Sequence, residues 1–396
     1  WSSDVCSSDL AHTAVSLCKT HGVRQVVISP GSRNAPLTLG FTSDPFFECF
    51  SIVDERSAAF FAMGLAQQSG TPAALVCTSG SALLNYYPAI AEAYYSRIPL
   101  LVLSADRPPY KIDIGDGQTI RQDGVYDRHI GYSARLLQDP GHATERIRWP
   151  NGDQPESPAA LKTLIAERQQ FNEREIHKAL QSAFQECLPV HLNLPFEEPL
   201  YTTTDIPPCH PGVMPFPAVG ESSLPFAALR ESWKQSERKM VLVGAMAPGS
   251  IPEEVLQMLA ADPCVVVFTE TTSKLHHPAF FPSIDSIMAP LELQESPAEG
   301  FAHLRPNLLV TMGGMIVSKK IKQFLRKYPP GRHWHVDPLS ANDTFYCLDR
   351  HLKMAPGAFF SKLLEPGGAG AASGYRPYWE GVREQYLRGR KAYLKR

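Results

Sequence analysis

The sequence predicts an α/β protein built from two doubly wound, mostly parallel sheets. Short apolar runs that read as buried strands recur along the chain, and amphipathic or irregular segments separate them. This alternation is typical of βαβ units with parallel strands and right-handed crossovers. A proline-rich segment at 206–217 interrupts it midway. That segment predicts a linker between two domains, at 10–205 and 218–366.

The first domain is expected to begin with a helix over about 10–20. Leu10, Ala14, Leu17 and Cys18 share one face of this helix, and Gly22 follows it as a C-terminal cap. Strands are expected at 25–29, 73–77, 99–104 and 190–194, with a short β-rich run that ends at 51–53. Helices are expected from residue 55 to about 66, over 82–95 and over 159–185, with a surface loop at 139–158.

The second domain repeats the alternation. Its short apolar strands are expected at 240–243, 265–268, 308–311 and 333–336. Gly244 follows the first of them, but no GxGxxG motif is present, so a nicotinamide site is not predicted. Lys319, Lys320 and Lys322 are expected on a solvated helix face. A glycine-rich stretch at 366–374 predicts a flexible linker, and a helix is expected over 378–395.

Composition limits the classes of function. A chain of 396 residues with 43% hydrophobic content can bury two domain cores. The net charge of -2 argues against nucleic-acid or membrane-surface binding, and no apolar run is long enough to span a membrane. Eight cysteines without a CxxC pair suggest a reducing cytoplasm. Residues 1–9, which contain the near-repeats SSDV and SSDL, are expected to be a non-native leader.

Unusual polar residues stand where the expected strands of the first domain end. Glu55 lies at a strand-to-helix junction, and Arg33 and Arg107 follow two other strands. Ser79 and Gly80 follow a fourth strand. The carboxyl ends of parallel strands are where open α/β sheets bind ligands. Glu55 has a second interpretation, because an acid in the first turn of a helix also complements the helix dipole.

Six motifs at these positions resemble one family of thiamine-diphosphate enzymes, the 2-succinyl-5-enolpyruvyl-6-hydroxy-3-cyclohexene-1-carboxylate (SEPHCHC) synthases. They are SPGSR at Ser29–Arg33, DER at Asp54–Arg56, TSGSA at Thr78–Ala82, ADRPP at Ala105–Pro109, QTIRQ at Gln118–Gln122 and PFEEPLY at Pro195–Tyr201. Many thiamine-diphosphate enzymes share the DE helix and the TSG loop. The combination of SPGSR, ADRPP and QTIRQ in this order is specific to the synthases.

The resemblance implies roles for individual residues. Glu55 would be the catalytic acid, hydrogen-bonded to the pyrimidine of the cofactor. The cofactor would be bound by Pro30, Glu55, Thr78, Ser79 and Gly80. The substrate would be bound by Ser32, Arg33, Arg107 and Gln118, because a guanidinium fork matches a carboxylate. Arg107 has a structural alternative, a weak ion pair with Asp106 or Asp54.

The resemblance also implies an activity. The family forms part of menaquinone biosynthesis: its members are transferases that decarboxylate 2-oxoglutarate and add the succinyl unit to isochorismate. The domain at 10–205 would be the pyrimidine-binding domain, and 218–366 a central, dinucleotide-binding-like domain. Residues 367–396 would be a linker and the start of a third domain that carries the diphosphate and Mg²⁺ site. The full enzyme is expected to be a homodimer or a dimer of dimers, and this chain alone is expected to be inactive.

Other interpretations of the same sequence remain open. The chain could belong to another thiamine-diphosphate carboligase, similar to acetolactate synthase, or to a binding module without catalysis. No metal ligands are assigned to this chain. Gly115–Gly117 matches the start of the family's magnesium motif but lacks the downstream Asn, so a flexible turn is expected. His276, His277, His333 and His335 lack a third ligand close in sequence and are interpreted as structural.

Overall fold

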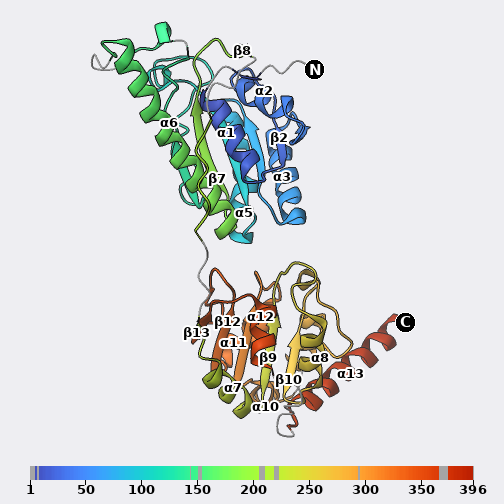
Figure 1. The fold of residues 1–396 in the computed structure, drawn as a ribbon. Helices are drawn as coiled ribbons and strands as arrows, with labels where there is room; N and C mark the ends of the chain where they lie inside the picture. Colours follow the sequence, from blue (N-terminus) through green and yellow to red (C-terminus); the bar gives the residue numbers. More distant parts are fainter. Residues whose placement is uncertain are drawn as a thin grey trace. The chain divides into compact units, whose positions relative to one another are not determined.

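The computed structural model describes residues 5–6, 9–142, 144–149, 154–204, 210–217, 223–292, 295–364 and 373–395. The chain divides into two compact units, Trp1–Val219 (unit 1) and Gly220–Arg396 (unit 2). Each unit is built around its own parallel sheet (Figure 1). The α/β class predicted from the sequence is therefore confirmed. None of the described helices is long and apolar enough to cross a membrane.

Unit 1 is organised around a six-stranded parallel sheet with the strand order β3-β2-β4-β5-β7-β6. Its strands are β2 (Gln25–Ile28), β3 (Glu48–Ser51), β4 (Ala73–Cys77), β5 (Leu100–Asp106), β6 (Tyr132–Arg135) and β7 (Val190–Pro195). Its helices are α1 (Asp9–Thr20), α2 (Ala35–Ser43), α3 (Glu55–Ser69), α4 (Ser81–Asn85), α5 (Tyr87–Ser96) and α6 (Pro158–Gln181). A π-helical turn, Ser182–Glu186, extends α6, so the expected helix over 159–185 is confirmed.

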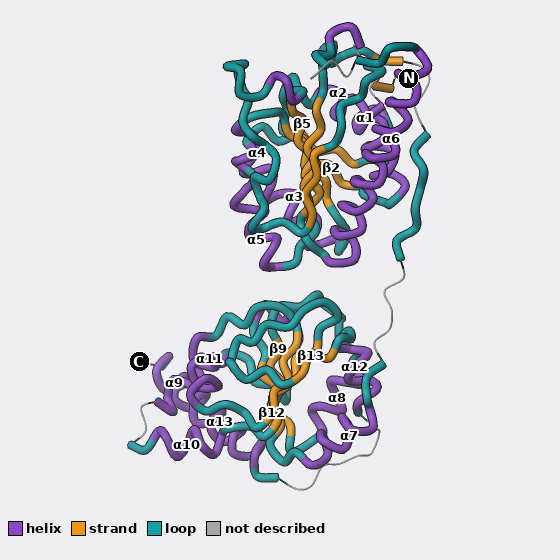
Figure 2. Tube along the Cα trace, turned by 90° about the vertical axis from the view of Figure 1, so that its left-hand side faces the viewer, coloured by secondary structure: helices purple, strands orange, loops and turns teal. Residues whose placement is uncertain are grey.

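Helices cover both faces of this sheet. Helices α1, α2 and α6 lie on one side, and α3, α4 and α5 on the other (Figure 2). Alternate residues of each strand point to opposite faces, so Val26 and Ile28 of β2 join the core under α1, while Val27 joins the core under α3. Strands buried on both faces need apolar residues at every position. This burial explains why the last three residues of β2, all of β4 and the first four residues of β5 appear in the sequence as continuous apolar runs.

The structure differs from the expectation in several elements of unit 1. The helix expected over 82–95 is two helices that meet at Tyr86, whose hydroxyl oxygen is hydrogen-bonded to Ser29 Oγ at 3.0 Å and to Val76 O at 3.1 Å. Strand β3 ends at Ser51, whereas the sequence predicted a β-rich run that continues to residue 53. Strand β6, at the sheet edge, was not predicted. A two-stranded antiparallel pair, β1 (Val5–Cys6) with β8 (Thr203–Thr204), includes two residues of the supposed leader; its residues 1–4 and 7–8 lie outside the described residues.

Part of the expected linker at 206–217 lies against unit 1. Residues 206–209 are outside the described residues, whereas 210–217 are described as an irregular segment. His177 Nε2 is 2.8 Å from the carbonyl oxygen of Gly212, and the ring of Phe216 stacks on His21 at a centroid distance of 4.4 Å. Gln185 donates to the carbonyl of Pro217 at 2.7 Å. These contacts fix the end of the segment to α1 and α6.

Unit 2 contains a five-stranded parallel sheet with the order β10-β9-β11-β12-β13. Its strands are β9 (Lys239–Val243), β10 (Val265–Phe268), β11 (Leu308–Met312), β12 (Arg332–Val336) and β13 (Arg350–Leu352). Its helices are α7 (Phe226–Gln235), α8 (Glu253–Ala261), α9 (Ile284–Glu292), α10 (Pro297–Leu304), α11 (Lys319–Lys327), α12 (Pro356–Leu363) and α13 (Tyr375–Leu394). Helices α7, α8 and α12 cover one face, and α9, α10, α11 and α13 the other (Figure 2).

Helix α13 begins inside the core of unit 2. Trp379 is fully buried, with its ring 4.9 Å from that of Phe268 in β10, and Tyr375 is also buried. Tyr393 and Leu394, near the other end of the helix, are exposed. The sequence interpretation assigned 367–396 to a linker and the start of a further domain; residues 367–372 lie outside the described residues. The first turns of α13 are part of the packing of unit 2.

Candidate functional site

The candidate site lies at the carboxyl edge of the unit 1 sheet, where the loops after β2 and β4 touch. A Cβ atom added to Gly31 would lie 2.4 Å from Thr78 Cβ, a distance that real side chains do not reach. The SPGSR and TSGSA loops therefore pack backbone against side chain at this point. Only glycine at position 31 permits the approach.

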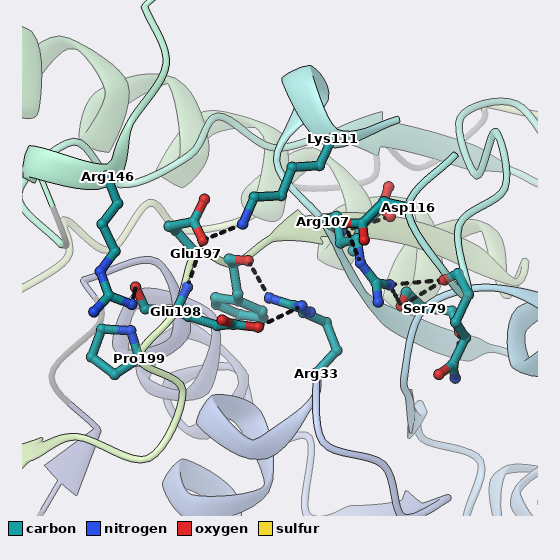
Figure 3. Close-up of polar contacts among 12 residues, drawn as sticks. Arg33, Ser79, Arg107, Lys111, Asp116, Arg146, Glu197, Glu198 and Pro199 are labelled. Atoms are coloured by element: carbon teal, nitrogen blue, oxygen red, sulfur yellow. Dashed lines mark hydrogen bonds and ion pairs between the residues drawn. The ribbon is translucent and has the colours of Figure 1, made fainter. Parts of the chain in front are cut away.

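Arg107 connects the loop after β5 to the TSGSA loop. Its Nη1 atom donates to Ser79 Oγ at 2.8 Å and to the carbonyl oxygen of Gln118 at 2.9 Å. Ser79 Oγ also donates to the Gln118 carbonyl at 3.1 Å, and Gln118 Nε2 donates to the Ser79 carbonyl at 3.2 Å. The ion partner of Arg107 is Asp116, 3.2 Å from Nε, rather than Asp106 or Asp54 (Figure 3). Three predicted site residues are thus brought together.

Gly80 has a backbone conformation that side chains rarely adopt. Its φ of 87° lies in the left-handed region, and an added Cβ would come within 3.0 Å of the Gln118 side chain. Its N–H donates to Gln122 Oε1 at 2.8 Å. The QTIRQ segment therefore holds the TSGSA loop through both Gln118 and Gln122.

Buried polar side chains lie behind these loops. Gln122 Nε2 donates to Asn193 Oδ1 at 2.7 Å, and Asn193 Nδ2 donates to Asp106 Oδ2 at 2.8 Å. Asp106 Oδ1 in turn accepts from the backbone N–H of Arg107 at 2.8 Å. Burial raises the pKa of Asp106, although the hydrogen bonds from Asn193 and Arg107 oppose that effect. This network links Gly80 to Arg107 through the interior of the sheet.

Arg33 is directed toward the segment after β7. Its side chain is almost fully buried; Nη1 donates to the carbonyl of Phe196 at 3.1 Å, and Nη2 lies 3.1 Å from Glu198 Oε1 (Figure 3). The Glu198 side chain is 53% exposed. Ser32, the neighbouring candidate, is itself exposed. The guanidinium of Arg33 therefore already holds one carboxylate, which solvent can reach.

A second set of charged residues, which the sequence interpretation did not assign, adjoins Arg33. Lys111 Nζ lies 2.6 Å from Glu197 Oε1, and Tyr110 donates to Glu197 Oε2 at 2.6 Å. Burial would raise the pKa of Glu197, but these hydrogen bonds outweigh it, so the pKa lies below its usual range. Arg146 donates to the carbonyl of Glu198 at 3.4 Å (Figure 3). The quoted PFEEPLY motif contained both acids, but only the tertiary contacts reveal their partners.

Glu55 begins α3, as the sequence predicted. Asp54 is the N-cap, since its Oδ1 accepts from the N–H of Ser57 at 2.7 Å, so the capping role belongs to Asp54. Glu55 is half-buried, and its Oε2 accepts from Asn85 Nδ2 at 3.2 Å. Burial raises the pKa of the Cys77 thiol beneath it, and the charge of Glu55 adds to that shift. Glu55 therefore lies above the end of β4 with an open side.

Exposed apolar residues occur on the elements that carry or contact this acid. Val53 is 80% exposed, while Phe60 and Phe61 of α3 and Leu84 of α4 are each exposed by about two fifths. A nearby cavity of about 350 Å³ is bordered by Pro30, Gly31 and Ser51. Pro30 is thus at the rim of an open space, whereas Thr78 and Ser79 are buried.

Three of the residues considered as possible metal ligands have other partners. Asp116, in the Gly115–Gly117 turn, pairs with Arg107, and Thr311 Oγ1 lies 2.8 Å from both His333 Nε2 and His335 Nδ1. Across the residues that the structure describes, there is no group of three or more His, Cys, Asp and Glu side chains that could hold a metal.

Comparison with known proteins gives two findings. Residues 8–126 match the family described as "Thiamine pyrophosphate enzyme, N-terminal TPP binding domain". Curated proteins named 2-succinyl-5-enolpyruvyl-6-hydroxy-3-cyclohexene-1-carboxylate synthase align with most of the chain. The one from Christiangramia forsetii is 51% identical over 344 residues, covering 86% of this chain and 58% of its own length. The one from Flavobacterium johnsoniae is 47% identical over 358 residues, covering 90% of this chain and 59% of its own length.

More distant relatives carry the same name. The synthase from Desulfotalea psychrophila is 37% identical over 388 residues, covering 95% of this chain and 65% of its own length. This chain therefore spans about three fifths of the length of the curated relatives that it matches.

Proposed function

Because this chain is a homologue of the SEPHCHC synthases and carries the N-terminal domain of thiamine pyrophosphate enzymes, we propose that it is part of a thiamine-diphosphate-dependent transferase of menaquinone biosynthesis. The enzyme decarboxylates 2-oxoglutarate and adds the succinyl unit to isochorismate. The observation that carries this proposal is the arrangement of Glu55, Arg33 and Arg107 at one edge of one sheet.

The chemistry of the chain fits the pyrimidine half of the cofactor. Thiamine diphosphate, when bound, supplies the carbon nucleophile of the reaction. Glu55 hydrogen-bonds to the pyrimidine ring; its half-buried carboxylate has Asn85 as a neighbour and an open, apolar side. Pro30, Thr78, Ser79 and Gly80 hold the cofactor from the two loops that meet at Gly31.

The two arginines bind substrate carboxylates. Arg107 is oriented by Ser79 and Gln118, so its position is fixed before a ligand arrives. Arg33 holds the exposed carboxylate of Glu198, which supports the view that its buried guanidinium accepts a carboxylate from the solvent side. Ser32 and Gln118 add hydrogen bonds at the same edge. Both substrates are dicarboxylates, which suits a site with two guanidinium groups.

Further parts of the proposal concern what lies beyond these residues. The diphosphate and its Mg²⁺ are held by the part of the longer relatives that does not align with this chain. The apolar surface formed by Val53, Phe60, Phe61 and Leu84 beside Glu55 is where a second subunit packs, in a homodimer or a dimer of dimers. The enzyme works in the cytoplasm, in keeping with the free thiols of Cys18, Cys49, Cys77 and Cys347.

A chimera tests the activity. The segment of the Christiangramia forsetii synthase that aligns with this chain is replaced by this chain, and product formation from isochorismate and 2-oxoglutarate is measured with thiamine diphosphate and Mg²⁺. The chimera is expected to turn over, and Glu55→Gln within it is expected to reduce kcat by about 10² to 10⁴. Asp54→Asn serves as the matched control, because it keeps the cap oxygen and leaves Glu55 intact.

Three results would count against the proposal. A folded chimera that uses pyruvate rather than isochorismate as the second substrate would favour an acetolactate-type carboligase, and unchanged activity after Arg33→Ala would favour it too. A folded chimera that binds substrate without any turnover would favour a binding module. The isolated 396-residue chain is expected to give no turnover in the same assay.

A further inference from the structure

Unit 2 contains a cavity of about 260 Å³ at the carboxyl ends of β11 and β12 that the proposed function does not use. It is lined by Thr311, Met312, Ile316, Lys322, His335 and Phe345, among others. The cavity adjoins a point where the chain direction changes: β9 connects to β10 on one side, while its neighbour β11 connects to β12 on the other. Parallel sheets bind ligands at the carboxyl side of such points.

Glycines bring the loops beside the cavity into close contact. A Cβ atom on Gly244 would lie 2.0 Å from the carbonyl oxygen of Gly314, and one on Gly313, whose φ is 77°, would lie 2.8 Å from the carbonyl of Ala245. Gly314 N–H donates to the same carbonyl at 2.7 Å. The loops after β9 and β11 are therefore packed backbone to backbone. This packing supports the loop after β11, whose residues Gly313 and Gly314 line the cavity.

His335 offers one ring nitrogen to the cavity. The residue is 8% exposed, and Thr311 Oγ1 is hydrogen-bonded to its Nδ1 at 2.8 Å. The same hydroxyl is hydrogen-bonded to His333 Nε2 at 2.8 Å. Thr311 thereby fixes the orientation of the His335 ring, and Nε2 has no hydrogen-bond partner among the described residues.

Lys322 supplies a positive charge. It is half-buried, and among the described residues it makes no hydrogen bond or ion pair, whereas the adjacent Lys320 pairs with Glu292. The sequence interpretation placed both lysines on a solvated face, and the structure instead turns Lys322 toward the cavity. A partly buried cation without a carboxylate partner is a feature of anion-binding sites.

Two carboxylates in the loop after β12 accept hydrogen bonds from backbone amides. Asp343 Oδ1 accepts from the N–H groups of Cys347 and Leu348 at 2.8 and 2.9 Å. Asp337 Oδ1 accepts from Leu339 and Ser340 at 2.8 and 2.9 Å. Both acids organise the loop after β12, and among the described residues neither forms an ion pair with Lys322.

We propose that this cavity binds a small organic carboxylate. Its charged group is placed between Lys322 and His335, and its apolar body lies against Met312, Ile316 and Phe345. The apolar wall favours an organic anion over inorganic phosphate, which would leave that wall uncovered. The volume is below the roughly 300 to 1,000 Å³ of pockets for drug-sized ligands, so the ligand has the size of a small metabolite. The inference does not depend on the reaction proposed for unit 1.

Benzoate is the probe, because it combines a carboxylate with a small apolar body, and benzamide is its neutral counterpart. Titration calorimetry on the full chain is expected to give saturable binding of benzoate with a Kd near or below about 1 mM. Lys322→Met is expected to weaken binding by about tenfold or more, since it removes a charge-assisted hydrogen bond. Lys319→Met, on the same helix but exposed and outside the cavity, is the matched control and leaves the Kd unchanged.

Two controls separate a loss of benzoate binding from a loss of folding and from changes in unit 1. The Lys322→Met variant must unfold at the same temperature as the unaltered chain, and Arg33→Ala must leave benzoate binding unchanged. The proposal is overturned if benzoate shows no saturable binding at about 10 mM. It is also overturned if benzamide binds equally well, or if Lys322→Met and Lys319→Met behave alike.

Discussion

Gly80 shows how one residue holds the candidate site together. Its φ of 87° and ψ of -145° are strained for any residue with a side chain, and a Cβ would press on Gln118 at 3.0 Å. We expect Gly80→Ala to reduce the free energy of unfolding of unit 1 by about 1–3 kcal/mol. Urea denaturation followed by circular dichroism measures the change.

Gly64 provides the control for this substitution. It lies within α3, and an added Cβ would meet nothing within 4 Å. Gly64→Ala is expected to stabilise the unit by about 0.5–1 kcal/mol, because alanine favours the helix. Equal effects of the two substitutions would show that the backbone conformation at Gly80 carries no strain.

His191 makes the stability of unit 1 depend on pH. The ring is buried, its Nδ1 lacks a hydrogen-bond partner among the described residues, and burial lowers its pKa from 6.5 to about 3. As the pH falls below 6.5, the unfolded state takes up a proton that the folded state takes up only near pH 3. Stability is therefore expected to fall through this window, by up to about 1.4 kcal/mol per pH unit from this residue.

A neutral replacement isolates this contribution. His191→Gln retains a polar group near Ser104, which lies 2.7 Å from His191 Nε2, but cannot take up a proton. Between pH 6 and pH 4, the unfolding free energy is expected to fall less steeply in the variant than in the unaltered protein. The two slopes are expected to differ by about 1.4 kcal/mol per pH unit. Parallel pH profiles for the two proteins would mean that His191 does not titrate in this range in the unfolded state.

Sequence analysis identified the site residues that stand in loops directly after strands. Arg107, Ser79 and Gln118 stand in loops that any parallel sheet gathers at one edge, and the structure brings them within hydrogen-bond distance. The partners that orient them were not assigned. Asn193 lies in a strand that looks like ordinary core, and its contact with Gln122 joins residues far apart in the chain. Such contacts depend on tertiary geometry that one sequence does not specify.

At the level of elements, α13 is held by its first turns. Trp379 is fully buried between Phe268 and Phe281, whereas Tyr393 is 75% exposed. We expect Trp379→Ala to destabilise unit 2 by about 3–5 kcal/mol, because it leaves a large cavity in the core. Tyr393→Ala, on the same helix, is expected to change stability by less than about 0.5 kcal/mol.

Thermal unfolding of both variants measures the difference. Hydrogen exchange of the peptides that contain β10 is expected to accelerate only in Trp379→Ala, because β10 contacts this side chain. An unchanged exchange rate there would place α13 outside the cooperative core of unit 2.

Strands with apolar runs were predictable, including the edge strand β10, whereas the edge strands β6 and β13 were not predicted. Strands β4, β5 and β9 are buried along their whole length, and apolar residues fill all of β4, the first four positions of β5 and the last four of β9. Strand β6, Tyr132–Arg135, and strand β13, Arg350–Leu352, lie at sheet edges and are partly exposed. They need no apolar run and give no periodic signal. Tyr86 divides one expected helix through hydrogen bonds to β2 and β4 residues, which helical spacing does not reveal.

At the scale of the whole molecule, two separate cores predict two separable stabilities. Lys239 is 1% exposed, 2.7 Å from Asp262 and within 4.8 Å of the ring centroid of Trp233. Lys239→Met leaves Asp262 without its counter-charge and is expected to destabilise unit 2 by about 3–5 kcal/mol. Protection of unit 1 amides against hydrogen exchange is expected to remain unchanged.

The surface pair of Lys320 and Glu292 is the control. Lys320→Met removes the same charge from the same unit but is expected to cost only about 0–1 kcal/mol, since the pair is partly exposed. If Lys239→Met also lowered protection in unit 1, the two units would unfold as one cooperative body.

The position of β7 in the sheet has a consequence for the time course of synthesis. Strand β5 is complete at Asp106, yet its neighbour β7 begins only at Val190. At about 5–20 residues per second, the growing chain leaves this edge unpaired for roughly 4–17 seconds. During that delay Ser104 and Asp106 keep polar side chains along the open edge, which discourages pairing with a stray strand. In the folded sheet the same side chains are hydrogen-bonded to Asn193 of β7.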